Sequence, residues 1–340
     1  MKFLLSLDYE LFFGSKIGSV DHCLIEPVTT LLKQLAHTGL KLSFFVDATF
    51  LVRLREEGKK FPVLQTEYDK IRQHLELLKK QGHDIQLHIH PHWIDSCFDG
   101  SSWRIHTDRY TLHDFSPGLR REIVSSCKQE LEQIVGDSVF AFRGGGWCIQ
   151  PFDQIADALH AENIWLESTV FFRGKSEDSQ RHYDFTAAPK SDHYCFSDDP
   201  VSEDPAGSFV EVPIGSFRVN PAFFWRLAWA KKFGGKKYRS FGDGSAMVAD
   251  RSYYLTRLTQ YTNSVVSIDG LKAGLLSKAY KQISEHREKN LLHAMGHPKA
   301  ISPYSIDKLA AFLTHQSFDY ITYQDLAYLN PAVRGTGNQP

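Results

Sequence analysis

The sequence predicts a parallel α/β fold with crossover helices. Along most of the 340 residues, short apolar runs typical of strands alternate with segments of helical periodicity, and this order indicates a parallel sheet. The composition, 42% hydrophobic and 13% aromatic, is sufficient for a sizeable core. The length allows either one large domain with insertions or two domains.

Nine segments are predicted to form strands, because each is apolar or alternating and is bounded by turn residues. Several of them end in polar residues that are suited to chemistry. The nine segments are Lys2–Leu7, Lys41–Val46, Asp84–His90, Val139–Arg143, Ile164–Ser168, Phe209–Pro213, Val265–Ile268, Leu291–Met295 and Tyr320–Tyr323.

Three helices have clear start or stop signals. Apolar residues recur at helical spacing over residues 71–78, and Gly82 follows as a stop signal. A second helix is expected over residues 116–136, where a serine and a proline open the segment. A third follows Ser302.

One long segment does not fit the alternation. Residues 171–207 are polar, aromatic and rich in Asp, Ser and Pro, so we expect a long insertion beside the main fold. Long ordered loops are usually functional. We therefore predict a single domain over residues 1–330, followed by a flexible tail at 331–340.

Composition and patterning disfavour several classes of protein. The 39 basic and 40 acidic residues give a formal charge of −1, which argues against nucleic acid as the main partner. Asp8 and Glu10 interrupt the N-terminal apolar run too early for a signal peptide, and no segment approaches the roughly 18 apolar residues of a membrane span. The five cysteines include no Cys-x-x-Cys pair, which disfavours a disulfide framework and a cysteine zinc site. We expect reduced thiols and a cytoplasmic protein.

The strongest signal for chemistry is a group of histidines that ends a predicted strand. His88 and His92 are four residues apart, but Pro91 excludes a helix between them and therefore a His-Glu-x-x-His site. In a strand, His88 and His90 point to opposite faces, and the turn at Pro91 can bring His92 back beside His88. We predict His88 and His92 as metal ligands and His90 as a structural or supporting residue. A histidine-rich strand end without a metal is the alternative.

Two acidic residues end the first predicted strand. Asp8 and Glu10 are two residues apart, so both carboxylates project from the same face. One of them can complete a three-ligand catalytic metal site with the histidines while the other acts as base. The alternative, a pair of solvated charges, is disfavoured by the apolar residues on both sides.

Two further strand ends carry candidate residues. Arg143 can hold a carboxylate, and the three glycines that follow it allow close approach of the backbone or an unusual turn. Trp147 either stacks on a sugar ring or lies in the core. His297 follows a strand in a Gly-His-Pro turn and is the expected acid, whereas His293 lies in mid-strand and is the expected core histidine.

Taken in order, these motifs resemble the polysaccharide deacetylase family, carbohydrate esterase family 4. The resemblance extends over nearly the whole chain, from Met1 to about Leu326. It rests on Leu5-Ser6-Leu7-Asp8-Tyr9-Glu10, Gly82-His83-Asp84-Ile85 with His88 and His92, Phe142-Arg143 with Trp147, and the late histidine. Two further strings are similar to the sub-branch found with bacterial surface-polysaccharide and O-antigen biosynthesis: Tyr183-Asp184-Phe185-Thr186 and Glu211-Val212-Pro213-Ile214.

The resemblance implies a distorted (β/α)7-type barrel with the site at the C-terminal ends of the strands. It implies a divalent ion, zinc or another transition metal, held by Glu10, His88 and His92, with Asp8 as base. In the family the two acids are adjacent, whereas Tyr9 separates them here. The swapped roles of Asp8 and Glu10 are therefore an alternative.

The implied reaction is hydrolysis of an N-acetyl group on a sugar. Arg143 would orient the base, and His297 would protonate the leaving amine. Trp147 and Trp93 are the expected sugar-binding residues. The family's fourth motif, which tunes the acid, has no clean match, and Glu167 is the nearest candidate.

Two other functions stay open. Hydrolysis of another C–N amide or of an O-acetyl ester uses the same activated water. A catalytically silent carbohydrate-binding protein is the second alternative, because the acid pair departs from the family pattern and the fourth motif is missing. One tightly held metal ion per chain would favour an enzyme over a silent protein.

Residues 223–239 mix aromatic and basic side chains and contain no acid. This pattern is typical of an interfacial helix or an anionic-headgroup site, and also of a solvated face over core aromatics. The first alternative predicts peripheral membrane contact through 223–239 and a lipid-linked or nucleotide-linked sugar as substrate.

Overall fold

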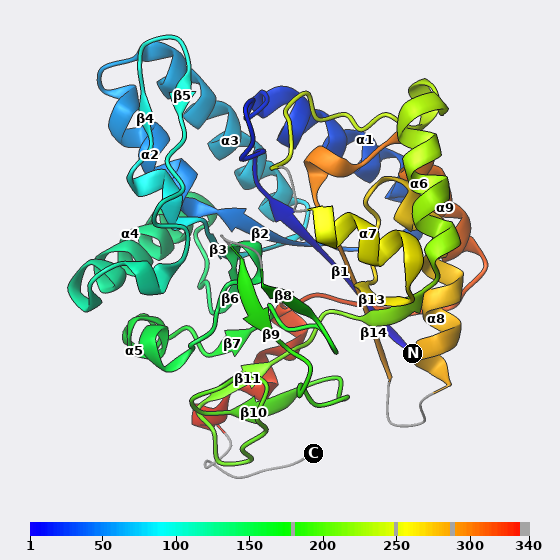
Figure 1. The fold of residues 1–340 in the computed structure, drawn as a ribbon. Helices are drawn as coiled ribbons and strands as arrows, with labels where there is room; N and C mark the ends of the chain where they lie inside the picture. Colours follow the sequence, from blue (N-terminus) through cyan, green and yellow to red (C-terminus); the bar gives the residue numbers. More distant parts are fainter. Residues whose placement is uncertain (178–180, 248–250, 286–289, 334–340) are drawn as a thin grey trace. The chain divides into compact units, whose positions relative to one another are not determined.

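The computed structural model describes residues 1–177, 181–247, 251–285 and 290–333 and has the mixed α/β fold that the sequence predicts (Figure 1). The chain divides into two compact units. Unit 1 consists of Met1–Leu42 and Ile214–Ile321, and unit 2 of Ser43–Pro213 and Thr322–Pro340. Each unit has its own parallel strands and its own helices.

The strands of unit 1 centre on β1, which is parallel to both β14 and β15. Leu7 of β1 pairs with Gly296 of β14, so Asp8 and His297 follow at the same level. β12 and β13 form a separate antiparallel pair. The strands of unit 1 are β1 (Lys2–Tyr9), β12 (Ser216–Val219), β13 (Thr262–Val265), β14 (Leu291–Gly296) and β15 (Asp319–Ile321).

The helices of unit 1 include the third helix predicted from the sequence. This helix, α9, begins after Ser302, whose hydroxyl accepts a hydrogen bond from the backbone N–H of Ser305 at 3.2 Å. It contacts α1 and α8. The helices of unit 1 are α1 (Glu26–Leu35), α6 (Pro221–Phe233), α7 (Arg251–Thr259), α8 (Leu276–Ser284) and α9 (Pro303–Thr314).

The sheet of unit 2 has the strand order β10-β11-β7-β6-β3-β2, and every neighbouring pair is parallel except β10 with β11. The register places Asp47, His88 and Arg143 side by side on β2, β3 and β6. It also pairs Glu167 of β7 with Glu211 of β11. The strands of unit 2 are β2 (Ser43–Asp47), β3 (Asp84–Ile89), β4 (Cys97–Phe98), β5 (Trp103–Arg104), β6 (Ala141–Gly144), β7 (Leu166–Glu167), β8 (Lys175–Glu177), β9 (His182–Asp184), β10 (Tyr194–Phe196) and β11 (Phe209–Glu211).

Four helices pack on one another and on this sheet. α2, α3 and α4 contact each other and β3, and α5 packs against α4. α4 ends before Gly136, which takes a φ of 65°, as the sequence predicts for a helix stop. The helices of unit 2 are α2 (Ala48–Gly58), α3 (Pro62–Lys80), α4 (Pro117–Val135) and α5 (Asp153–Ala161). None of the described helices of either unit is long and apolar enough to span a membrane.

The segment 171–207, expected as an insertion beside the main fold, contributes in part to the sheet. β8 and β9 form a hairpin, while β10 extends the sheet by pairing with β11. Of the tail expected at 331–340, Pro331–Val333 forms a short 3-10 turn and the remainder lies outside the described residues.

One predicted strand differs from its expectation at 265–268. β13 ends at Val265, where its antiparallel pairing with β12 stops. In the rest of the expected strand, Ser267 forms a parallel bridge to Met295 of β14. Val266 and Ile268 are fully buried. The apolar run at 265–268 therefore indicated that these residues are buried, and not that they form one continuous strand.

His74 on α3 should make the protein less stable in mild acid. Burial lowers the pKa of this imidazole to about 4, whereas the ordinary value in an unfolded chain is 6.5. The unfolded state therefore binds more protons between these values. The stabilisation is complete above pH 6.5 and falls by up to about 3 kcal/mol as the pH approaches 4.

Urea unfolding of His74→Gln between pH 7 and 4 should show a smaller loss of unfolding free energy than the wild type shows. His37→Gln, at an exposed position, is the control and should follow the wild type. An equal loss in His74→Gln and the wild type would contradict the prediction.

Candidate active site

A cluster of three buried histidines lies at the end of β3 in unit 2. The ring centroids of His88 and His90 are 4.7 Å apart, and those of His90 and His92 are 5.5 Å apart. Pro91 opens a short 3-10 turn. Among the described residues, the group of possible metal ligands contains His88 and His90, whereas the sequence predicted His92 as the partner of His88. The expectation that His90 points away from His88 is wrong, because β3 ends at Ile89 and its alternation does not reach His90.

The ring of His88 is held in one orientation. Its Nδ1–H donates a hydrogen bond to the backbone carbonyl of Arg143, 2.7 Å away. This bond fixes the tautomer and leaves the lone pair on Nε2. Metal-ligating histidines are oriented in the same way, through the nitrogen that does not bind the ion.

The glycines after Arg143 allow the close approach that the sequence suggested. A Cβ atom on Gly145 would lie 2.6 Å from Nδ1 of His90, so a side chain at this position would displace the histidine. Gly146 and Trp147 both take a φ of 63°, and this turn places the half-buried Trp147 ring 5.6 Å from that of Phe171.

Asp47 and Trp93 hold the histidine turn in place. The indole N–H of Trp93 donates to Oδ2 of Asp47 at 2.8 Å, and Oδ1 of Asp47 accepts from the backbone N–H groups of His90 and Phe50 at 3.4 Å. Trp93 is fully buried and packs against the rings of Phe50 and His92. Its expected role in sugar binding is therefore corrected to a supporting role, because no face of the ring reaches solvent.

Arg143 is buried among polar groups of unit 2. Its Nε donates to the carbonyl of Ser168 at 2.7 Å, and Nη2 donates to the hydroxyl of Tyr323 at 3.2 Å. Burial raises the pKa of both Glu167 and Glu211; the negative charge of Glu167 raises that of Glu211 further, while Arg143 opposes both shifts. The two carboxyls and one guanidinium therefore form a cluster in which burial opposes ionisation of both glutamates.

In unit 1, the end of β1 lies beside the end of β14. His297 Nε2 is 3.7 Å from Oδ2 of Asp8 and 3.7 Å from Oε1 of Glu10. His293 lies in the middle of β14, where its Nε2 is hydrogen-bonded to the hydroxyl of Ser6 at 2.9 Å. Of the two late histidines, the structure therefore places His297 beside the acids.

Asp269 is a residue of this group that the sequence reasoning missed. Its carboxylate lies 2.8 Å from Nδ1 of His297 and accepts the backbone N–H of the same residue at 2.8 Å. Burial alone would lower the pKa of His297, but the charge and hydrogen bond of Asp269, with Asp8 and Glu10, raise it overall. Asp269 is thus the carboxylate that contacts His297, and the signal for it in the sequence was its position directly after the apolar run at 265–268.

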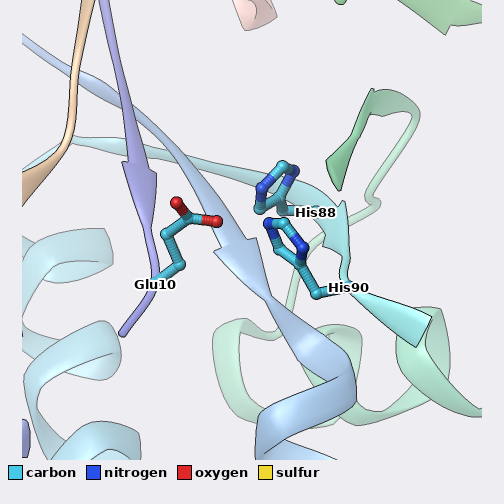
Figure 2. A group of neighbouring side chains, drawn as sticks. All are labelled: Glu10, His88 and His90. Carbon is cyan, nitrogen blue, oxygen red and sulfur yellow. The ribbon is translucent and has the colours of Figure 1, made fainter. Parts of the chain in front are cut away.

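Lys299 is a second residue that the sequence reasoning left without a role. Its Nζ donates to Oε1 of Glu10 at 2.9 Å and to the carbonyl of Leu11, and it lies 4.5 Å from the centre of the Phe13 ring. Lys299 is 8% exposed, so the pair is buried. Figure 2 shows Glu10, which follows β1, together with His88 of β3 and His90, which follows β3.

Comparisons with known proteins show that the fold of this chain is similar to those of several solved structures. No protein-family model and no curated protein sequence matches the chain. A GH57 branching enzyme from Thermococcus kodakaraensis, solved with glucose, matches with a TM-score of 0.51 and 11% identity over 99% of this chain and 72% of that one. At this identity the likeness shows the fold alone.

Two other solved structures are more distant in shape. A polysaccharide deacetylase from Mycobacterium smegmatis, as its description assigns it, has a TM-score of 0.48 and 14% identity, covering 93% of this chain and 80% of that one. A family 4 acetyl xylan esterase from Clostridium thermocellum, in complex with cobalt, has a TM-score of 0.39 and 10% identity, covering 98% and 96%.

Lys299→Met should destabilise the protein by about 3–5 kcal/mol, because the buried carboxylate of Glu10 loses its ammonium partner. Urea unfolding at pH 7 measures this change. The double variant Lys299→Met/Glu10→Gln should recover most of the loss, since neither charge then remains. If Lys299→Met alone were as stable as the wild type, the buried pair of Lys299 and Glu10 would not contribute strongly to stability.

Asp269→Asn should lower the pKa of His297, because burial then acts on the imidazole without the opposing carboxylate charge. Titration of the imidazole by NMR, on protein treated with a chelator, measures the shift. Ser6→Ala is the matched control: it removes the partner of His293 and should leave the titration of His297 unchanged. An unaltered His297 titration in Asp269→Asn would refute the assignment.

Proposed function

We propose that the protein is a metal-dependent hydrolase that removes N-acetyl groups from a carbohydrate. The observation that carries this proposal is the orientation of His88, whose Nδ1–H is fixed on the carbonyl of Arg143, so that Nε2 carries the lone pair with which an imidazole binds a metal ion. The sequence resemblance to the polysaccharide deacetylase family supports the choice of reaction.

The proposal includes a barrel. We propose that residues 1–330 form one distorted (β/α)7-type domain to which both units contribute, with the functional side chains at the C-terminal ends of its strands. The parallel pairing within each unit supports this arrangement.

The proposed metal ligands are Glu10, His88 and His92. The group whose ligand atoms lie within 4.8 Å of one another consists of Glu10, His88 and His90, so His90 is the alternative to His92 as third ligand. Two or three imidazoles and one carboxylate suit zinc or a neighbouring divalent transition metal. When bound, the ion supplies two effects, a lower pKa for a water molecule and a polarised carbonyl group.

The proton transfers fall to Asp8 and His297. Asp8 takes a proton from the attacking water, whose oxygen forms the new bond to the acetyl carbon. The family resemblance assigns the orientation of this base to Arg143. His297, protonated and held by Asp269, gives its proton to the leaving nitrogen as the C–N bond breaks, so the products are acetate and a free amine.

We propose that the substrate belongs to a bacterial surface polysaccharide or its lipid- or nucleotide-linked precursor, and that the protein acts in the cytoplasm. The motif strings at 183–186 and 211–214 support this placement. Trp147 is the sugar-stacking candidate that we retain, because it is half-buried whereas Trp93 is fully buried.

We also propose peripheral membrane contact through residues 223–239, and the exposed aromatic side chains of α6 support this proposal. Trp225, Trp229 and Phe233 are 60%, 62% and 62% exposed. They recur every four residues and therefore share one face of the helix. Aromatic side chains on such a face, near lysines, suit the boundary of a membrane.

Metal content and acetate release from N-acetylglucosamine oligomers test the proposed function. The wild type should hold about one divalent ion per chain, and His88→Ala should lose the ion and roughly 100-fold or more in rate. His297→Gln should keep the ion and lose about 10²–10⁴-fold in rate. His37→Ala, at an exposed position, is the control and should match the wild type in both measurements.

Other outcomes separate the alternatives. A wild type that binds no metal after reconstitution with zinc contradicts the proposal and favours a silent carbohydrate-binding protein. Acetate release from O-acetyl esters but not from N-acetyl sugars would identify an esterase with the same catalytic groups.

A further inference from the structure

Unit 1 contains a cavity of about 780 Å³ beside α6. Its wall includes residues 227–239, which cover the C-terminal part of α6 and the segment after it, and residues 269–272. The volume lies within the range of about 300–1,000 Å³ that is usual for small-molecule sites. Its size alone therefore permits a ligand larger than a single ion.

The charged lining of this cavity is almost entirely positive. Asp269 is the only carboxylate among the described residues that line it, and that carboxylate is hydrogen-bonded to His297. We call the positive members the basic cluster: Lys231, Lys232, Lys236, Arg239 and Lys272.

Lys272 is the least exposed member of the basic cluster. Burial, together with the positive charges of Arg257 and Lys231, lowers its pKa to about 8, although Asp269 acts in the opposite direction. A bound anion would relieve this repulsion. Lys237 lies in the same segment but outside the lining, and it is paired with Asp307 at 3.2 Å.

Much of the rest of the lining is apolar, with Tyr238 and Ser240 as its further polar residues. Phe12, Leu227, Phe233 and Leu271 contribute side chains to the same cavity. A cavity lined by both cationic and apolar side chains suits a phosphate ester. The anionic phosphate would contact the cations, and an aromatic or hydrocarbon group at the other end would contact the apolar residues. Inorganic phosphate alone would use only the charged part.

We propose that this cavity binds the phosphate or diphosphate ester of an organic ligand through the basic cluster. Such an ester has two sources, a nucleotide-linked compound and a lipid phosphate. The chemistry recognised is the same in both cases, since each combines a phosphoryl anion with a less polar group.

The position of the cavity connects it to the candidate catalytic acid. Asp269 lines the cavity and also binds His297, so a phosphoryl group held there lies near the group that would protonate the leaving amine. This connection, which makes the ester a part of the substrate, rests on the proposed deacetylase function. Binding of the ester itself does not depend on that function.

Calorimetric titration of the full chain with pyrophosphate and with uridine diphosphate tests the inference. Lys231→Gln/Lys236→Gln should weaken binding of both probes by about 10-fold or more, because two charge-assisted contacts are lost. Both lysines are exposed, so their replacement does not endanger folding. Lys272→Met should also weaken binding, whereas the control Lys237→Ala should remain within about twofold of the wild type.

Two further probes distinguish the sources of the ester. Tighter binding of uridine diphosphate than of pyrophosphate indicates a nucleotide-linked ligand. Preference for phosphatidylcholine vesicles that contain phosphatidic acid, lost in Lys231→Gln/Lys236→Gln but kept in Lys237→Ala, indicates a lipid phosphate. Vesicle binding that depends on Trp225 and Trp229 but not on the basic cluster, with no binding of pyrophosphate, overturns the proposal.

The remaining outcomes separate this inference from the proposed function. Equal weakening in the control Lys237→Ala and in the cavity variants would show diffuse charge attraction and overturn the inference. His88→Ala should bind pyrophosphate as the wild type does, so the cavity can be verified even if no acetate release is found. If acetate release is found, Lys231→Gln/Lys236→Gln should raise KM for a diphosphate-linked N-acetyl sugar and leave KM for the unlinked sugar unchanged.

Discussion

Parallel pairing in a fixed register is the constraint on which the site in each unit depends. In unit 2 it brings Asp47, His88 and Arg143 to one level, so that a carboxylate, an imidazole and a guanidinium leave adjacent strands together. In unit 1 the same kind of pairing aligns Asp8 with His297. A slip of one residue would turn these side chains to the opposite face of the sheet. The register therefore fixes the levels at which these strands deliver their last side chains and from which the following turns begin.

Several of the buried charged groups have an oppositely charged group beside them. Lys299 compensates Glu10, and Asp269 compensates His297. Arg143 lies near two glutamates that cannot both ionise at low cost. Burying such groups without partners would cost several kcal/mol each. The pairing explains how so many ionisable groups occur in a well-packed interior.

The sequence predicted the fold better than it predicted the partners of the site residues. Strands and the best-capped helices were recognisable because apolar periodicity and turn residues are local signals. The histidine turn was recognisable because Pro91 excludes a helix. Asp269 and Lys299 were not assigned, since their roles come from contacts with His297 and Glu10 that only the folded chain creates. Trp93 was misassigned because sequence shows an aromatic ring but not its burial.

The two oxygens of Asp47 link a helix to the histidine turn. One accepts the N–H of Phe50 at the start of α2 and the N–H of His90, and the other accepts the indole of Trp93. Unwinding of the first turn of α2 and release of the histidines are consequently one event rather than two. The time for which the histidines stay ordered is thus limited by the rate at which the first turn of α2 opens. The histidines and this turn of α2 belong to the same cooperative unit.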